Sequence, residues 1–210
     1  MPKYHLYPSL LDSFAWFKKS EAENALEELL NKINRVRTAP SDAMLRGIAF
    51  EDHLTHAARG FAFPASPEGL VKCHDTDISV DLLEQFVDRL RGSVRQVFVE
   101  TWLDCAAGQV RVYGYVDNIL RDTAIDTKTT GKYEFPKYLH SFQRPAYMEA
   151  LKPSGIDKFQ FLVTDFKSLY VEEYAYNSAD TDRLRSEINE LVDLIEANRE
   201  KITDKKVFGG

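Results

Sequence analysis

The sequence contains only two cysteines, Cys73 and Cys105, in 210 residues. Two thiols are too few for a disulfide framework or for a four-cysteine iron–sulfur cluster, so no such cluster is expected. No apolar run approaches the roughly 18 residues that cross a bilayer, and the first residues lack the apolar stretch of a secretory signal. We therefore expect a soluble, cytoplasmic protein with no membrane partner.

Positive charge is also scarce, since the formal net charge is −6. A protein that coats nucleic acid is usually basic, so this balance counts against that class. It does not exclude an enzyme acting on nucleic acid, because clustered acids that hold cations add negative charge and a local basic groove can coexist with them. The length and the 44% hydrophobic content fit one globular domain over residues 1–210.

Helical spacing of apolar residues predicts helices in the first ninety or so residues and near the C-terminal end. The expected ranges are 10–17 with Ser9 as N-cap, 20–36 with a capping box at Ser20 and Glu23, 41–57 with Ser41 as cap, 79–90 and 179–202. The third of these helices is expected to bury Met44, Leu45, Ile48, Leu54 and Ala57. Residues 60–77, rich in proline and glycine, are expected to be irregular.

From Val94 the apolar period becomes that of strands. Three strands at 96–104, 110–120 and 124–129, joined by short turns, predict an antiparallel meander. A helix at 135–151 and a hairpin with strands at 158–164 and 169–176 follow. The sequence thus predicts an α/β (α+β) fold in which a central mixed β-sheet is flanked by helices.

The pattern Asp-x-Lys occurs at residues 126–128, 165–167 and 204–206. Only the first copy lies on a predicted strand flanked by apolar residues; the second falls in a hairpin turn and the third in the C-terminal tail. Strand alternation places Asp126 and Lys128 on one face. Pairing across the turn at 121–123 can bring Asp117 close to Asp126.

Two carboxylates and a lysine are groups that can hold a hard cation and activate a water molecule. Mg²⁺ or Mn²⁺ prefers oxygen ligands and keeps several waters, so one or two carboxylates and a substrate phosphate suffice. Such a cation lowers the pKa of bound water, and Lys128 could orient that water or stabilise a transition state. The alternative is a plain surface salt bridge between Asp126 and Lys128.

Flanking motifs favour the cation site. Gly114-Tyr-Val-Asp117, Asp126-Thr-Lys128 and Gln143-Arg-Pro-Ala-Tyr147 resemble, in order and spacing, the GxxD, (D/E)xK and QxxxY signature of the RecB-like branch of the PD-(D/E)XK nuclease superfamily. Residues 47–51 (GIAFE) resemble the first helical motif of that branch, and residues 7–14 (YPSLLDSF) its short N-terminal helix. The resemblance implies a restriction-endonuclease-like fold.

The resemblance also implies roles for single residues. Metal ligation would come from Asp117, Asp126, the backbone carbonyl of Thr127 and, directly or through water, Glu51. Lys128 would be the catalytic lysine. Gln143 and Tyr147, one helical turn apart, would contact DNA or order the active-site groups.

Other charged residues leave alternatives open. Lys132, Lys137, His140 and Arg144 could line a groove that binds DNA phosphates, or they could form an ordinary solvated surface. Residues 73–77 (CHDTD) match no standard zinc spacing, and Glu100 has a structural role at least as readily as one at the site.

By resemblance, the protein would be a Mg²⁺- or Mn²⁺-dependent DNA exonuclease or related nuclease of repair, recombination or phage replication that leaves a 5′-phosphate. The competing interpretation is an inactive nuclease fold that binds DNA or a partner protein. A third is a subunit that cuts only within a complex. Because the sequence lacks GxxxxGK[ST], ATP-driven unwinding would require a helicase or recombination partner.

Overall fold

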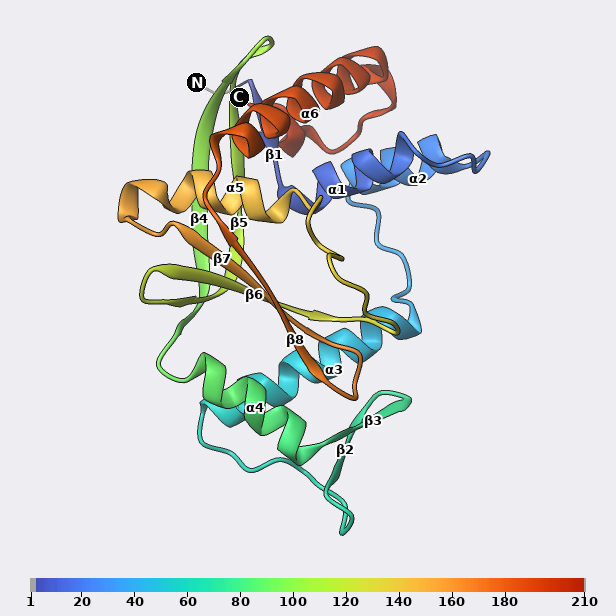
Figure 1. Cartoon of the computed structure of the whole chain (residues 1–210). Coiled ribbons are helices and arrows are strands. Elements are labelled where there is room, and N and C mark those ends of the chain that lie inside the picture. Colours follow the sequence, from blue (N-terminus) through green and yellow to red (C-terminus); the bar gives the residue numbers. More distant parts are fainter. Residues whose placement is uncertain (1–2, 210) are drawn as a thin grey trace.

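A mixed six-stranded sheet runs through the computed structural model, which describes residues 3–209 (Figure 1). Its strands are β1 (Tyr4–Leu6), β4 (Val94–Cys105), β5 (Gly108–Leu120), β6 (Thr123–Thr129), β7 (Lys158–Thr164) and β8 (Leu169–Ala175). The order is β1, β5, β6, β7, β8, with β4 paired to the other edge of β5. Strands β4, β5 and β6 form the predicted meander, whereas β1–β5 and β6–β7 are parallel pairs. The predicted fold class is confirmed.

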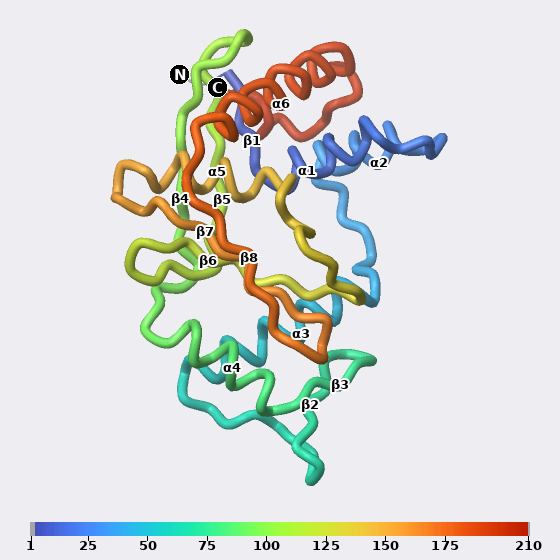
Figure 2. Tube along the Cα trace, in the orientation of Figure 1, coloured from blue at the N-terminus to red at the C-terminus, as the bar shows by residue number. Residues whose placement is uncertain are grey.

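Helices cover both faces of this sheet. They are α1 (Pro8–Phe17), α2 (Ala25–Ile33), α3 (Asp42–Ala58), α4 (Val80–Leu90), α5 (Gln143–Leu151) and α6 (Ser178–Ala197), with 3₁₀ turns at Lys152–Ser154, Arg199–Lys201 and Lys205–Val207. Helices α5 and α6 lie over β4 and β5, while α3 and α4 pack at the other end with a hairpin of β2 (Leu70–Cys73) and β3 (Thr76–Ser79) (Figure 1). The first and last described residues lie together beside β1, where the Gly209 N–H donates to the Lys3 carbonyl at 2.8 Å (Figure 2).

The sheet opens along one edge of β5. Strand β1 pairs with this edge at Val110–Val112, and β6 pairs with it only at Asn118–Leu120. Within residues 3–209, no strand pairs with the edge between 113 and 117. Strand β6 diverges there and continues along β7 as far as Thr129. The opening lies beside Asp117 and Asp126, so the strand split positions the candidate site.

The two faces of β6 and β7 contribute to different apolar clusters. Ala124 and Phe161 pack with α5, whereas Ile125 and Leu162 pack with α3 and α4. Because side chains alternate along a strand, Asp126 points to the side of α5. Thr127, the next residue, points to the side of α3 and α4. The sheet therefore receives groups for one site from helices on both of its faces.

Several predicted helix starts are confirmed and others are wrong. The hydroxyls of Ser41 and Ser79 accept backbone N–H groups as N-caps of α3 and α4. Helix α1 instead has Tyr7 as its N-cap, because Pro8 at the first helical position already fixes the helical backbone. The Ser20 hydroxyl accepts the N–H of Ala22 at 3.2 Å within a turn, so α2 starts later than expected.

Three further predictions need correction. Met44 and Ile48 are 58% and 52% exposed, because the buried face of α3 consists of residues nearer its C-terminal end. The segment 60–77 includes the β2 strand and the first half of β3 rather than only irregular chain. Helix α5 starts at Gln143 and not near 135, since buried Glu172 holds the preceding segment by accepting two of its backbone N–H groups at 2.8 and 3.0 Å.

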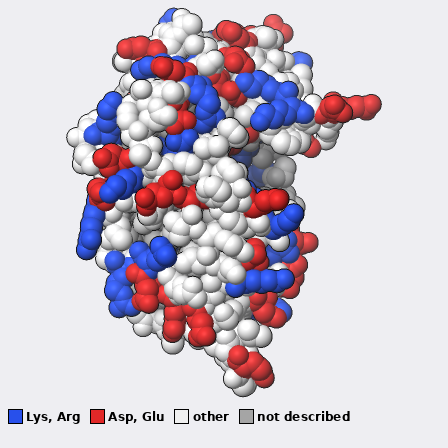
Figure 3. All heavy atoms as spheres, in the orientation of Figure 1, with Lys and Arg blue, Asp and Glu red and all other residues white. Residues whose placement is uncertain are grey.

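Charged side chains of both signs are interspersed on the surface shown in Figure 3. Among the described residues, no helix is long and apolar enough to cross a membrane.

Candidate active site

Asp117 ties the two diverging strands together. Its Oδ2 accepts the backbone N–H of Thr127 at 3.0 Å and lies 3.3 Å from the hydroxyl of the same residue. The other carboxylate oxygen lies 3.4 Å from Nε2 of Gln96 on β4. The Asp117 side chain thus links β5 to β6 at a point where the backbones of the two strands are not paired. This link holds the Asp117 carboxylate at the opening.

Thr127 connects this carboxylate to helix α3. Its hydroxyl is hydrogen-bonded to Oε1 of Glu51, which projects from α3 toward β6. Arg95 on β4 approaches the same glutamate, with 3.8 Å between its guanidinium and Oε2. The structure therefore brings Glu51 and Asp117 to one threonine, through its backbone N–H and hydroxyl. The metal-ligating role expected for the Thr127 carbonyl stays a prediction.

Asp126 and Lys128 form the second part of the site. Nζ of Lys128 lies 2.5 Å from Oδ2 of Asp126, whose residue is only 2% exposed. From α5, the side-chain amide of Gln143 donates to Oδ1 of the same carboxylate at 3.3 Å. The predicted strand carboxylate, lysine and glutamine are thus in contact.

The carboxylates affect one another electrostatically. Burial raises the pKa of Asp126 to about 7; Lys128 opposes this shift, and the charges of Asp117 and Glu51 add to it. Burial also raises the pKa of Glu51, against the hydrogen bond from Thr127. Burial favours a neutral amine at Lys128, but attraction to Asp126 outweighs it and raises the lysine pKa. A group of buried acids with one lysine would gain from a further positive charge.

These residues fit a hard divalent cation. Oδ2 of Asp126 is buried and accepts no well-directed hydrogen bond from the described residues, although the Lys128 ammonium lies 2.5 Å away. Within residues 3–209, no three histidine, cysteine or acidic side chains converge closely enough to hold an ion alone. Mg²⁺ needs only one or two carboxylates, because water and substrate phosphate complete its shell. Asp117 and Asp126, with the carbonyl of Thr127 and Glu51 through water, could therefore hold it.

The packing between α5 and β5 explains the glycine of the GxxD motif. A Cβ at position 114 would lie 2.9 Å from both the ring and the hydroxyl of Tyr147. Only glycine allows this approach, which places the tyrosine ring at 6% exposure against the sheet. Burial raises the pKa of Tyr147, so its hydroxyl stays protonated. Gly114 and Tyr147 thus fix the helix that carries Gln143.

The three basic side chains that were expected to contact DNA lie in different surroundings. Lys132 and Lys137 are exposed on the segment between β6 and α5, where Lys137 Nζ donates to a backbone carbonyl at 2.8 Å. Arg144 is instead 5% exposed and grips Asp180 with two hydrogen bonds of 2.5 and 2.9 Å. Because its guanidinium pairs with Asp180 on α6, Arg144 does not line a groove that binds DNA phosphates, and this prediction is corrected.

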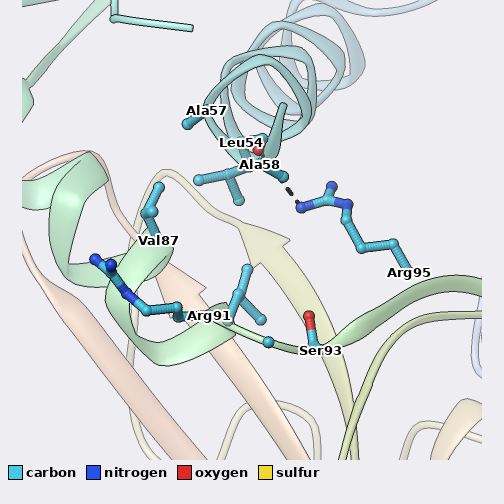
Figure 4. A pocket seen from close by; sticks show the side chains of 9 residues that line it. Leu54, Ala57, Ala58, Val87, Arg91, Ser93 and Arg95 are labelled. Atoms are coloured by element: carbon cyan, nitrogen blue, oxygen red, sulfur yellow. Dashed lines mark hydrogen bonds between the residues drawn. The ribbon is translucent and has the colours of Figure 1, made fainter. Parts of the chain in front are cut away.

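Two residues that hold elements of the candidate site, Asp12 and Arg95, were not predicted from the sequence. Half-buried Asp12 on α1 accepts the backbone N–H of Phe142 at 2.6 Å and the hydroxyl of Ser141 at 3.1 Å, which anchors the start of α5. Arg95 reaches α3 at a cavity of about 520 Å³, where it donates to the Leu54 carbonyl at 3.5 Å (Figure 4). The only sequence signal for Asp12 was its place in the N-terminal helical motif.

The weaker candidates have structural partners. Cys73 is buried in β2, and burial raises the pKa of its thiol to about 11, which makes it a poor metal ligand. His74 lies 3.3 Å from Asp42 and does not meet the neighbouring acids as a metal clip. Glu100 pairs with Arg111 at 2.5 Å.

The mixed sheet opens beside Asp117 on β5 and Asp126 on β6, and Lys128 follows two positions after Asp126. This arrangement defines an α/β fold of nuclease type. The family model of the PD-(D/E)XK nuclease superfamily matches residues 9–206, so the chain belongs to this superfamily. No curated protein sequence matches the chain significantly.

Two solved structures are similar to the chain. The chain is similar to LHK-Exo in complex with dAMP, with 16% identity, a TM-score of 0.50, and coverage of 93% of this chain and 89% of that chain. It is also similar to SSO0001, with 14% identity, a TM-score of 0.49, and coverage of 91% and 77%, respectively. At these identities the likeness concerns the fold alone.

Proposed function

We propose that the protein is a Mg²⁺- or Mn²⁺-dependent deoxyribonuclease that hydrolyses phosphodiester bonds at the opening between β5 and β6. The observation that supports this proposal is that Asp126 pairs with Lys128 while Asp117 bonds to Thr127, the residue between them, in a member of a nuclease superfamily. A module that only binds DNA has no need for two neighbouring carboxylates and a lysine paired with one of them.

Each residue then has a distinct task. Asp117 and Asp126 would hold the cation, which when bound supplies charge neutralisation of the phosphoryl oxygens and a more acidic water. Thr127 fixes the Asp117 carboxylate through its N–H, and Glu51 adds an acid within reach of a bound water. Each acid is held by a neighbour in the fold, so little reorganisation is needed when substrate arrives.

Lys128 would supply positive charge to the reacting phosphate or orient the attacking water. Its ammonium is a compact donor that cannot itself ligate a cation. Gln143 holds the Asp126 carboxylate from the side of α5, and Tyr147 closes that side by packing on Gly114. Lys132 and Lys137 lie on an exposed segment that could follow the DNA backbone.

We further propose an exonuclease of the RecB-like branch, acting in repair, recombination or phage replication. The order of the GxxD, DxK and QxxxY motifs supports the branch. The shared fold with LHK-Exo is consistent with an exonuclease but does not define the mode of cutting.

A labelled-DNA assay tests both levels of this proposal. Linear and circular DNA, each single- and double-stranded, are incubated with Mg²⁺, Mn²⁺ or EDTA, with Asp126→Asn as the inactive control. We expect metal-dependent cleavage of linear DNA only. Cleavage of circular DNA would indicate an endonuclease instead of an exonuclease. No cleavage of any substrate would favour the inactive binding module.

A further inference from the structure

One face of β4 and β5 carries a row of aromatic side chains. Helices α5 and α6 lie over the opposite face of these strands (Figure 1). In the register of the pair, three side chains of β4 stand directly across from three of β5: Phe98 opposite Tyr115, Glu100 opposite Tyr113, and Trp102 opposite Arg111. We call these six residues the aromatic face.

The aromatic face is open to solvent. Phe98, Trp102 and Tyr115 are 44%, 48% and 57% exposed, although the alternate residues of the same strands, such as Val112 and Val116, are buried. A contiguous exposed aromatic patch on a protein surface often marks a binding site. Three large rings on one face therefore require an explanation beyond folding.

Contacts within the face fix the rings. Phe98 and Tyr115 meet edge to face with 5.3 Å between ring centroids. The guanidinium of Arg111 lies 5.0 Å from the ring centre of Tyr113 and 6.0 Å from that of Phe98. Arg35, from the connection between α2 and α3, donates to the Tyr113 hydroxyl at 2.7 Å. The rings form an ordered surface, which lowers the entropy lost when a ligand stacks on it.

The row leads to the candidate active site. Residues 111, 113 and 115 occupy alternate positions of β5, and the next such position is Asp117. Alternate residues of a strand are about 6.8 Å apart. That is about twice the 3.4 Å rise per nucleotide in a duplex strand, so an unstacked, extended strand fits the spacing better than a duplex.

Chemistry further restricts the ligand. Arg111 is neutralised by Glu100 and Arg35 by Asp204, at 2.5 and 3.3 Å, so the face offers ring surfaces rather than net positive charge. In a duplex the base faces are stacked on one another and cannot lie on protein rings. Unpaired bases can, and such stacking tolerates any base sequence.

We propose that the aromatic face binds the unpaired bases of single-stranded DNA and leads its backbone toward Asp117. This inference rests on the proposed nuclease function for the identity of the substrate. Because the stacking contacts are uncharged, affinity should depend less on salt than it does for a protein with a basic groove. The strand would be recognised without regard to sequence.

The sequence contains two tryptophans, Trp16 and Trp102, which makes a direct optical test available. In Trp16→Phe only the tryptophan of the aromatic face remains; in the matched control Trp102→Phe only Trp16 remains, on α1 and 51% exposed. Both proteins are titrated in EDTA, without turnover, with short oligothymidylate and with a duplex of the same length. We expect single strands to quench Trp102 emission and leave Trp16 emission unchanged, and the duplex to quench neither.

Alanine variants measure the contribution of each ring. Phe98→Ala and Tyr115→Ala should each weaken oligothymidylate binding in EDTA by about 5- to 150-fold, the range for loss of one stacked base. The matched control is Phe61→Ala, because this ring is 63% exposed but lies beyond α3. Circular dichroism and melting of each variant separate lost contacts from lost folding.

The outcomes distinguish the two proposals. Quenching of Trp102 by single strands supports the aromatic face even if the protein cleaves nothing, in which case only the nuclease proposal fails. DNA cleavage by the native protein with Trp102 emission and Phe98→Ala affinity both unchanged overturns the aromatic face. It is also overturned if light scattering shows a native dimer that Phe98→Ala converts to a monomer, because the face would then bind a second copy of the chain.

Discussion

Asp126-Thr-Lys128 and Asp165-Phe-Lys167 share a sequence pattern but have different structures. In the first, on β6, the buried aspartate pairs at 2.5 Å with a half-buried lysine. In the second, the Asp165 carboxylate caps the β7–β8 turn by accepting the N–H groups of Lys167 at 3.0 Å and Ser168 at 2.9 Å. Its lysine side chain is not part of that contact. The same three-residue pattern thus yields an ion pair in one place and a turn in the other.

The two aspartates also differ in their acidity. Burial raises the pKa of both carboxyls, but the backbone hydrogen bonds at Asp165 outweigh it and leave that pKa lowered. At Asp126 no backbone donor compensates, and neighbouring acids add to the shift, so its pKa rises to about 7. The two aspartates thus differ in their surroundings, and the pattern Asp-x-Lys alone does not provide a buried carboxylate that a cation could neutralise.

The largest contrast is expected in cleavage. Asp126→Asn keeps the shape of the side chain but removes the charge that would hold the cation, so we expect single-turnover cleavage to fall by about 10³-fold or more. Asp165→Asn, the matched control, should cleave at the native rate. Equal loss in both variants would mean that the effect comes from folding and not from the site.

Lys128 and Lys167 provide the second contrast. Removing a positioned positive charge from a transition state costs about 10²- to 10³-fold in rate, so Lys128→Ala should lose that much. Because the ammonium competes with a cation for Asp126, Mn²⁺ affinity should be kept or increased. Lys167→Ala should change neither quantity. Full cleavage by Lys128→Ala would refute its proposed role.

The raised pKa predicts a pH-dependent stability in EDTA. The folded state binds the Asp126 proton more tightly than the unfolded chain, whose ordinary value is 3.8, so this contribution is present at low pH and is lost as pH rises toward about 7. Asp126→Asn should remove that decline. At pH 8 we expect it to melt higher than the native protein by at least about 2–4 °C, the shift for 1 kcal/mol in a domain of this size.

For Asp165 the sign is the reverse. Its lowered pKa stabilises the fold above its ordinary range and this contribution is lost in acid. Asp165→Asn should therefore lower the melting temperature mainly above about pH 4, where the native carboxylate is charged, and change it little in acid. A native melting curve that is flat between pH 4 and 8 would contradict the assignment at Asp126.

Packing between β5 and α5 gives a smaller effect. Gly114→Ala would place a methyl group 2.9 Å from Tyr147, and we expect a loss of about 1–3 kcal/mol in unfolding free energy. Gly131→Ala, with no atom within 4 Å of its added Cβ, should cost little. Urea unfolding of both variants measures the difference, and equal stabilities would show that α5 moves to accommodate the methyl group.

The smallest effects should come from α5. Gln143→Ala removes a single hydrogen bond of 3.3 Å to Asp126, worth about 1 kcal/mol, and should slow cleavage by about fivefold. We expect it and Tyr147→Phe to change DNA handling rather than Mn²⁺ affinity, because neither an amide nor a phenol is a strong ligand for a hard cation. Native cleavage rates at every salt concentration would remove both residues from the proposed site.

Period-two alternation located the strands of the meander and of the β7–β8 hairpin within about two residues, because burial on one or both faces leaves a clear pattern. The short β2–β3 hairpin was missed, since four-residue strands among prolines and glycines carry little periodicity. Exposed Met44 and Ile48 show that an apolar stripe can continue beyond the part of a helix that the core covers.

The site was predictable where residues lie on adjacent strands. Asp117, Asp126 and Lys128 follow from strand order and alternation, while Glu51 required the family motif. Arg144 was misplaced because the residue after Gln143 points about 100° around the helix, toward Asp180 on an element not adjacent in sequence. Asp12 makes its contacts about 130 residues away, which no local pattern could reveal.

Calorimetric titration of Mn²⁺ tests the central claim most directly: the surroundings of Asp126, and not its Asp-x-Lys pattern, make a cation site. The native protein and Asp165→Asn should bind Mn²⁺ with equal affinity at pH 8, and Asp126→Asn should bind it at least about tenfold more weakly, a difference of 1.4 kcal/mol. The account would be contradicted if the native protein binds no Mn²⁺, or if Asp126→Asn binds it as tightly as the native protein does.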